Sequence, residues 1–178
     1  WDSTHRDVHP EPTTYDELLE KTIAYGTAVR KADPDAIIAG PAEWGWPAYF
    51  YSGKDAKVGF RLKPDRRAHD DMPLLAWYLK KLHEHEKKTG IKILDVLDVH
   101  IYPQGDGVQY VDEEGGDGGG NTDRATNELR LRTTRSLWDR DYKDESWIGE
   151  SGEDGGRVYL IPRMKQLIAE NYPGLGFQ

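Results

Sequence analysis

Helix-like and strand-like hydrophobic patterns alternate along this chain. Apolar residues recur at helical spacing in four stretches, separated by short apolar runs of the length of buried strands. The helical patterns cover 14–32, 70–89, 125–137 and 157–171, and the strand-like runs lie at 36–40 and 93–102, with a further strand beginning at 175–178. This order predicts an α/β fold with a parallel sheet covered by helices. A doubly wound sheet and a segment of a (β/α)8 barrel both fit it.

Two segments between these elements are irregular or short. Residues 43–68 carry many aromatic side chains but no sustained period, which predicts a long loop of functional importance. Residues 146–150 predict a short extended piece. At the helix ends, Thr14 and Glu17 form a capping box, and Gly90 is placed to end the second helix.

Composition narrows the classes of function. The chain has 6 Trp and 10 Tyr but only 3 Phe, a bias that packing alone or a sugar-binding cleft lined with rings would each explain. A net charge of −8 argues against a nucleic-acid partner. With no cysteine there is no thiol nucleophile or zinc-thiolate site, and no apolar run approaches the roughly 20 residues of a membrane span.

Ionisable and aromatic groups gather where two predicted strands end. Glu43 and Trp44 follow the first strand, and Asp98, His100 and Tyr102 share one face of the second. In barrels, functional groups lie at the carboxyl ends of strands, so these positions predict a site. For Glu43 the alternative is a loop residue that only forms hydrogen bonds. For His100 it is a histidine in the barrel interior whose hydrogen bonds are satisfied within the protein.

Two carboxylates would be needed to cleave a glycosidic bond, one as acid and one as nucleophile or base. From position alone, Glu43 and Glu150 are the nominees, although Glu150 also fits a polar loop.

The Gly-rich acidic stretch 104–122 offers hard oxygen ligands that would suit a structural Ca²⁺. The candidate ligands are Asp112, Glu113 and Asp117, and the alternative is a solvated acidic loop. No cofactor is required by any other pattern in the chain.

Three groups of segments together resemble glycoside hydrolase family 44, the endoglucanases and xyloglucanases. The most specific is Glu-Trp-Gly-Trp-Pro-Ala-Tyr-Phe-Tyr at 43–51. The others are 3–10 with 14–18, and Asp-Val-His-Ile-Tyr-Pro at 98–103 with 136–139 and 145–148.

The resemblance implies that residues 1–178 are a single segment of a (β/α)8 TIM barrel, from after strand four to the start of strand seven. The family's acid/base and nucleophile lie in Asn-Glu-Pro and Thr-Glu-Tyr motifs, neither of which occurs here. We therefore expect no catalytic residue in this segment, which alone should be inactive. Its expected contribution is a set of substrate-binding residues: Glu43, Trp44, Trp46, Tyr49, His100, Tyr102 and Trp138.

The implied parent protein is a secreted, monomeric glycosidase, a cellulase-type endoglucanase or xyloglucanase. It would cleave internal β-1,4-glucosidic bonds of plant polysaccharide by a retaining mechanism. Its partner would be a β-glucan polysaccharide or oligosaccharide, with no membrane or nucleic acid involved. A non-catalytic carbohydrate-binding domain is the main alternative, but such domains are usually β-sandwiches and lack long helices. A nucleotide-binding domain has no Gly-rich phosphate loop to support it.

Overall fold

The computed structural model describes residues 9–105, 107–108 and 122–178. The chain divides into two compact units, one formed by residues 1–100 with 166–178 and the other by residues 101–165. From sequence we expected one continuous barrel segment over residues 1–178.

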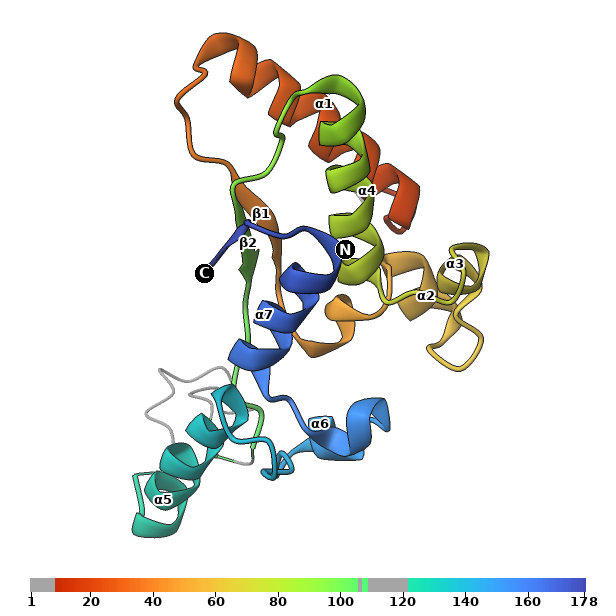
Figure 1. Ribbon diagram of the computed structural model, residues 1–178. Helices are drawn as coiled ribbons and strands as arrows, with labels where there is room; N and C mark the ends of the chain where they lie inside the picture. Colours follow the sequence, from red (N-terminus) through yellow and green to blue (C-terminus); the bar gives the residue numbers. More distant parts are fainter. Residues whose placement is uncertain (1–8, 106, 109–121) are drawn as a thin grey trace. The chain divides into compact units, whose positions relative to one another are not determined.

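The first unit is built on three parallel strands (Figure 1). They are β1 (Ala39–Glu43), β2 (Val96–Val99) and β3 (Gly176–Phe177), and they lie side by side in chain order. Leu97 stands at the centre of this sheet, level with Gly40 on one side and Phe177 on the other. The prediction of an α/β fold with parallel strands is confirmed, including the strand at the end of the chain.

Of the two long helices in this unit, α1 (Tyr15–Ala32) and α4 (Leu74–Thr89), α4 supplies more of the buried side chains. Figure 1 shows the two helices beside one another next to the strands. The buried face of α4 presents Leu75, Leu79 and Leu82, as the helical spacing predicted. On α1 the buried residues are Tyr15 and Gly26, and Gly26 allows close approach to Ile93.

The helix-end signals are confirmed in part. The Thr14 hydroxyl oxygen accepts a hydrogen bond from the Glu17 amide at 3.2 Å. The carboxylate of Glu17 contacts His9 and Lys21 and makes no reciprocal bond to the cap, so only half of the capping box forms. Gly90 ends α4 in the left-handed region at φ 74°.

The first strand begins three residues later than its apolar run predicted. The Ile38 amide donates to the carboxylate of Asp95 at 2.9 Å, and that carboxylate also pairs with Arg30. Residues 36–38 are therefore held by a side chain rather than by a full strand ladder.

The aromatic segment after β1 is more regular than the sequence suggested. It folds into three short helices: η1 (Trp46–Tyr49), α2 (Gly53–Val58) and α3 (Pro64–Ala68). Each is too short to show a hydrophobic period, which is why the sequence pattern predicted a loop.

The second unit contains short helices. They are α5 (Arg124–Thr133), η2 (Thr134–Leu137), α6 (Trp147–Glu150), η3 (Glu153–Gly156) and the first half of α7 (Leu160–Asn171). The extended piece expected at 146–150 was wrong, because the Ser146 hydroxyl caps α6 by accepting from the Ile148 amide. Among the described helices, none has the length and apolar character needed to cross a membrane.

Candidate functional site

The ends of β1 and β2 are joined by one backbone hydrogen bond. The amide nitrogen of His100 donates to the carbonyl oxygen of Glu43 at 2.8 Å. Both residues lie at the carboxyl edge of the parallel sheet, the edge at which α/β proteins place their functional groups. The sequence predicted a site at both strand ends, and these ends lie together because the two strands are adjacent and parallel.

The side chain of Glu43 is a buried carboxyl. It is only 5% exposed, and burial raises its pKa from 4.5 to about 7. A carboxyl with such a pKa exchanges its proton near neutral pH, so it can donate a hydrogen bond in one form and accept in the other. It also contributes to raising the pKa of the neighbouring Tyr49 phenol, after the larger effect of that group's own burial.

His100 presents an exposed imidazole on the same face of β2 as Asp98. The ring Nε2 lies 3.7 Å from the Asp98 carboxylate, so a protonated imidazole would be paired. The period of two along the strand predicted this shared face, although Asp98 was not in the expected set of substrate-binding residues. Its place beside His100 adds it to the candidate site.

Two of the expected cleft rings belong to the core. Trp46 is 2% exposed and packs edge-on against Phe50, with ring centroids 4.8 Å apart. Tyr49 is equally buried, and its hydroxyl donates to the carbonyl oxygen of His100. The expectation that Trp46 and Tyr49 stack on substrate is therefore corrected. They pack beneath the strand ends, where Trp46 contacts Phe50 and Tyr49 bonds to the His100 carbonyl, and neither ring is free to stack on a sugar.

Trp44 remains a candidate for sugar stacking in this unit. Its side chain is 40% exposed, and it directly follows Glu43 at the end of β1. An indole that combines an exposed face with a polar N–H suits recognition of a sugar ring and its hydroxyls.

Tyr102 and Trp138 belong to the second unit, and each is more than half exposed. Tyr102 lines a cavity of about 720 Å³ between residues 101–104 and the α5–η2 segment. Trp138 follows η2 and is not part of that lining. The described structure therefore brings Glu43, Trp44 and His100 together in the first unit, and Tyr102 lines a cavity of the second unit.

A buried carboxylate that the sequence did not single out organises one wall of this cavity. Asp144 accepts hydrogen bonds from the hydroxyls of Ser136 and Ser146, at 2.9 and 2.5 Å. It thereby fixes η2 to the start of α6. An isolated Asp in a polar stretch gives no signal of such a role.

The predicted Ca²⁺ ligands Asp112, Glu113 and Asp117 lie outside the described residues. Asp123, at the end of that stretch, uses its carboxylate to cap α5 through the Thr126 amide and hydroxyl. Within the described ranges, no three His, Asp or Glu side chains are arranged to hold a metal. Glu150, one of the two nominees from position alone, is exposed at the end of α6.

Comparison with known proteins supplies the family. Residues 1–105 match glycoside hydrolase family 44. The chain is 38% identical to endoglucanase A of Paenibacillus lautus over 98% of its own length, which is 23% of that protein.

Solved structures agree with this match. The crystal structure of CelM2, a bifunctional glucanase-xylanase from a metagenome library, superposes with a TM-score of 0.85 and 40% identity, over 99% of this chain and 32% of CelM2. A Paenibacillus polymyxa xyloglucanase of family 44 with xyloglucan superposes with a TM-score of 0.77 and 29% identity, over 99% of this chain and 32% of that one. The chain thus spans between about a quarter and a third of the relatives named here. By the family match, which covers more than half of its residues, this chain belongs to glycoside hydrolase family 44.

Proposed function

We propose that the protein containing these residues hydrolyses internal β-1,4-glucosidic bonds of plant polysaccharides such as cellulose-type glucans and xyloglucan, with xylan, whose backbone bonds are β-1,4-xylosidic, as a further substrate. The observation that carries this proposal is the pairing of Glu43 with His100 at the carboxyl edge of the sheet, with Trp44 beside them. The relatives named above are a glucanase-xylanase, an endoglucanase and a xyloglucanase, which supports this substrate class.

In the mechanism that we propose, this segment binds and orients substrate while two carboxylates elsewhere perform a retaining double displacement. β1, β2 and β3 would be strands five, six and seven of a (β/α)8 barrel, since they are parallel and adjacent in chain order. Glu43 would hydrogen-bond a sugar hydroxyl or a catalytic carboxylate, Trp44 would stack on a glucose ring, and His100 and Tyr102 would bind hydroxyls. Trp138 would add a second exposed ring.

The catalytic pair belongs to the Asn-Glu-Pro and Thr-Glu-Tyr motifs, which residues 1–178 do not contain. A polypeptide of residues 1–178 should therefore release no reducing ends from xyloglucan or carboxymethylcellulose. Activity of that polypeptide that is lost in Glu43→Gln or Glu150→Gln would instead make these residues the catalytic pair. We further propose that the parent protein is secreted and monomeric, and that it needs no cofactor, although a structural Ca²⁺ could bind the acidic loop.

The proposal is tested with the parent protein on soluble xyloglucan. An endo-acting enzyme should lower the viscosity of the solution well before reducing sugar accumulates, and a retaining one should release the β-anomer first. Binding of the polysaccharide without any fall in viscosity would point to a non-catalytic carbohydrate-binding role. Release of the α-anomer first would contradict the retaining mechanism.

A further inference from the structure

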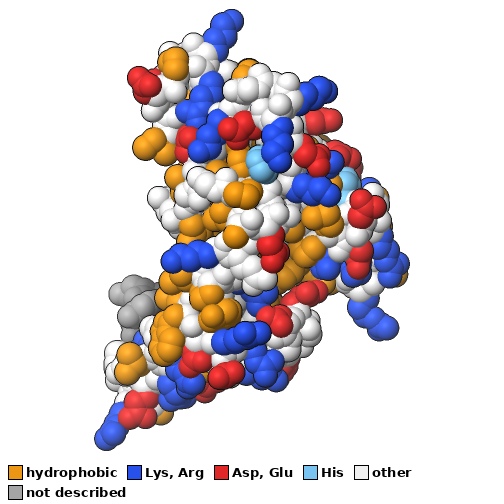
Figure 2. Space-filling model, in the orientation of Figure 1, with side chains coloured by type: hydrophobic (Ala, Val, Ile, Leu, Met, Phe, Trp, Pro, Cys, Tyr) orange, Lys and Arg blue, Asp and Glu red, His pale blue; other side chains and the backbone are white. Residues whose placement is uncertain are grey.

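Within the excursion between β1 and α4, residues 54–67 separate their charges by sign, and the exposed acids Asp70 and Asp71 follow that stretch. Residues 54–67 hold six of the 24 Lys and Arg residues of the chain but only two of its 32 Asp and Glu residues. Both acids, Asp55 and Asp65, are buried, whereas most of the cations are exposed. Figure 2 shows Lys and Arg side chains gathered over α2 and α3, on the right of the view. A chain with a net charge of −8 therefore carries a local cationic surface.

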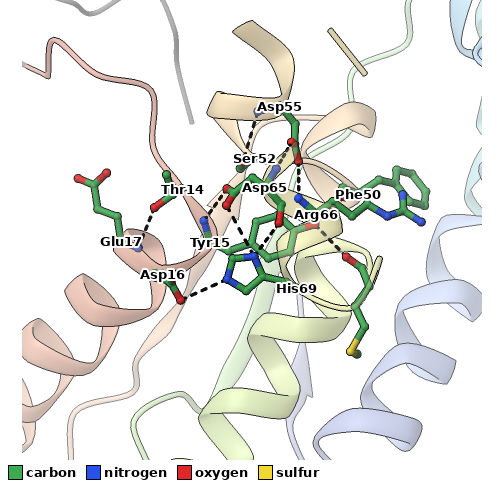
Figure 3. Close-up of polar contacts among 11 residues, drawn as sticks. Thr14, Tyr15, Asp16, Glu17, Phe50, Ser52, Asp55, Asp65, Arg66 and His69 are labelled. Carbon is green, nitrogen blue, oxygen red and sulfur yellow. Dashed lines mark hydrogen bonds and ion pairs between the residues drawn. The ribbon is translucent and has the colours of Figure 1, made fainter. Parts of the chain in front are cut away.

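The two acids face inward because backbone amides at helix starts satisfy them (Figure 3). The carboxylate of Asp55 accepts from the amides of Asp65 and Arg66, at 2.8 and 3.1 Å, at the first turn of α3. The carboxylate of Asp65 accepts from the amide of Tyr15, at 3.0 Å, at the first residue of α1. Carboxylates at such positions stabilise helix N-termini. They are therefore committed to the fold and do not screen the cations outside.

Apolar side chains lie among these cations. Phe60 is 41% and Leu62 56% exposed. The ring of Phe60 rests on the buried ring of Tyr51, with centroids 4.8 Å apart, so it is held in place while one side meets solvent. Exposed apolar groups in a cluster indicate a binding surface more often than scattered ones do.

Several of the cations make no ion pair within the described residues. Lys54, Arg61 and Arg67 are exposed and have no carboxylate within ion-pair distance there. Lys57 has only a long contact of 3.9 Å to Glu11. We define the cationic–apolar surface as Lys54, Lys57, Phe60, Arg61, Leu62 and Arg67. It offers positive charges alternating with apolar patches.

We propose that the cationic–apolar surface binds an acidic polysaccharide, a chain of uronic acid residues. Each sugar of such a chain carries a carboxylate for the exposed cations and an apolar C–H face for Phe60 or Leu62. Binding would hold the enzyme on a carboxylate-bearing matrix while its cleft acts on neutral glucan. The choice of a polysaccharide over a nucleic acid rests on the proposed function, because the charges alone would suit either polymer.

The test uses the parent protein and sodium polygalacturonate, with affinity electrophoresis as the measurement. A triple variant with Lys54→Glu, Arg61→Glu and Arg67→Glu should bind polygalacturonate at least about tenfold more weakly than wild type. Each exposed charge contributes modestly, and three are reversed together. Binding of the wild type should weaken as salt rises, because exposed charges are screened. The matched control is a triple variant with Lys80→Glu, Lys88→Glu and Lys165→Glu, which makes the same change of net charge at exposed sites elsewhere. Its affinity for polygalacturonate should stay within about twofold of that of the wild type.

A second variant, Phe60→Ala, tests the apolar contribution and should weaken binding at high salt as well as at low salt. Absence of binding by the wild type, an equal loss in the control, or equal or tighter binding of duplex DNA or of anionic lipid vesicles would each overturn the proposal. Hydrolysis of neutral xyloglucan is measured on the same samples. Protein that binds polygalacturonate without hydrolysing glucan would contradict the proposed function alone, and protein that hydrolyses without binding would contradict this inference alone.

Discussion

The amide of His100 donates to the carbonyl oxygen of Glu43 at 2.8 Å, across the carboxyl ends of two adjacent parallel strands. The residues are 57 positions apart in sequence, and the long excursion through η1, α2, α3 and α4 returns the chain to this point. Beneath the junction, the hydroxyl of Tyr49 donates to the carbonyl oxygen of His100. The candidate site is therefore supported by buried groups rather than by a free loop.

Replacement of Glu43 by Gln should change how stability depends on pH. Burial raises the pKa of Glu43 from 4.5 to about 7 in the folded chain. Below pH 4.5 both the folded and the unfolded state hold the proton. As pH rises toward 7 the unfolded state loses its proton first, so the wild type loses stability by on the order of 3 kcal/mol and then levels off. Glu43→Gln should lack this decline.

Denaturant unfolding of the parent protein at a series of pH values between 4 and 8 measures this effect. The difference in free energy of unfolding between Glu43→Gln and wild type should move in favour of the variant across that window. Parallel curves for the two proteins would show that the carboxyl is not held neutral by burial.

Removal of the Tyr15 hydroxyl should destabilise the first unit. This hydroxyl lies 2.9 Å from the carbonyl oxygen of Phe50 (Figure 3) and 2.9 Å from that of Met72, and its single proton is shared between these two acceptors. Tyr15→Phe removes the donor to the Met72 carbonyl and leaves the Phe50 carbonyl with only the Leu74 amide, so it should cost about 1–2 kcal/mol. Tyr25→Phe is the matched control, because the Tyr25 ring is 70% exposed on the same helix, and it should change the melting temperature little. Equal melting temperatures for both variants would contradict the anchoring role of Tyr15.

A methyl group at position 26 should be too large for the space between α1 and Ile93. A Cβ added to Gly26 would lie 2.5 Å from the Cγ2 methyl of Ile93, a fully buried and β-branched residue. Overpacking costs about 1–3 kcal/mol, more than the roughly 0.5–1 kcal/mol that alanine gains over glycine in a helix. Gly26→Ala should therefore lower the melting temperature, whereas Thr27→Ala, at the exposed neighbouring position, should not. A stabilised Gly26→Ala would mean that α1 can move outward freely.

The elements that could be predicted from sequence are those with a long hydrophobic period. The spacing of Leu75, Leu79 and Leu82 predicted α4, and alternation along 96–100 predicted that Asp98 and His100 share a face. The start of β1 could not be predicted, because it depends on the side chain of Asp95, a residue distant in sequence. The same limit applied to the aromatic segment, whose short helices are defined by tertiary contacts.

The candidate site was predicted in part for a similar reason. Sequence position identified the strand ends, and hence Glu43, Trp44 and His100. It did not separate rings that face solvent from rings that face the core, so Trp46 and Tyr49 were misassigned. Burial of an aromatic side chain depends on which helix packs over it, and a four-residue turn such as η1 carries no period that reveals this.

The central claim is that the carboxyl ends of β1 and β2 form part of a polysaccharide cleft, and Trp44→Ala tests it most directly. An aromatic contact contributes on the order of 1 kcal/mol, so kcat/KM of the parent enzyme on soluble xyloglucan should fall about five- to tenfold, mainly through a higher KM. Tyr25→Ala, at an exposed ring on α1, is the control and should leave kcat/KM within about twofold of wild type. A Trp44→Ala enzyme with wild-type kcat/KM and KM would contradict the claim.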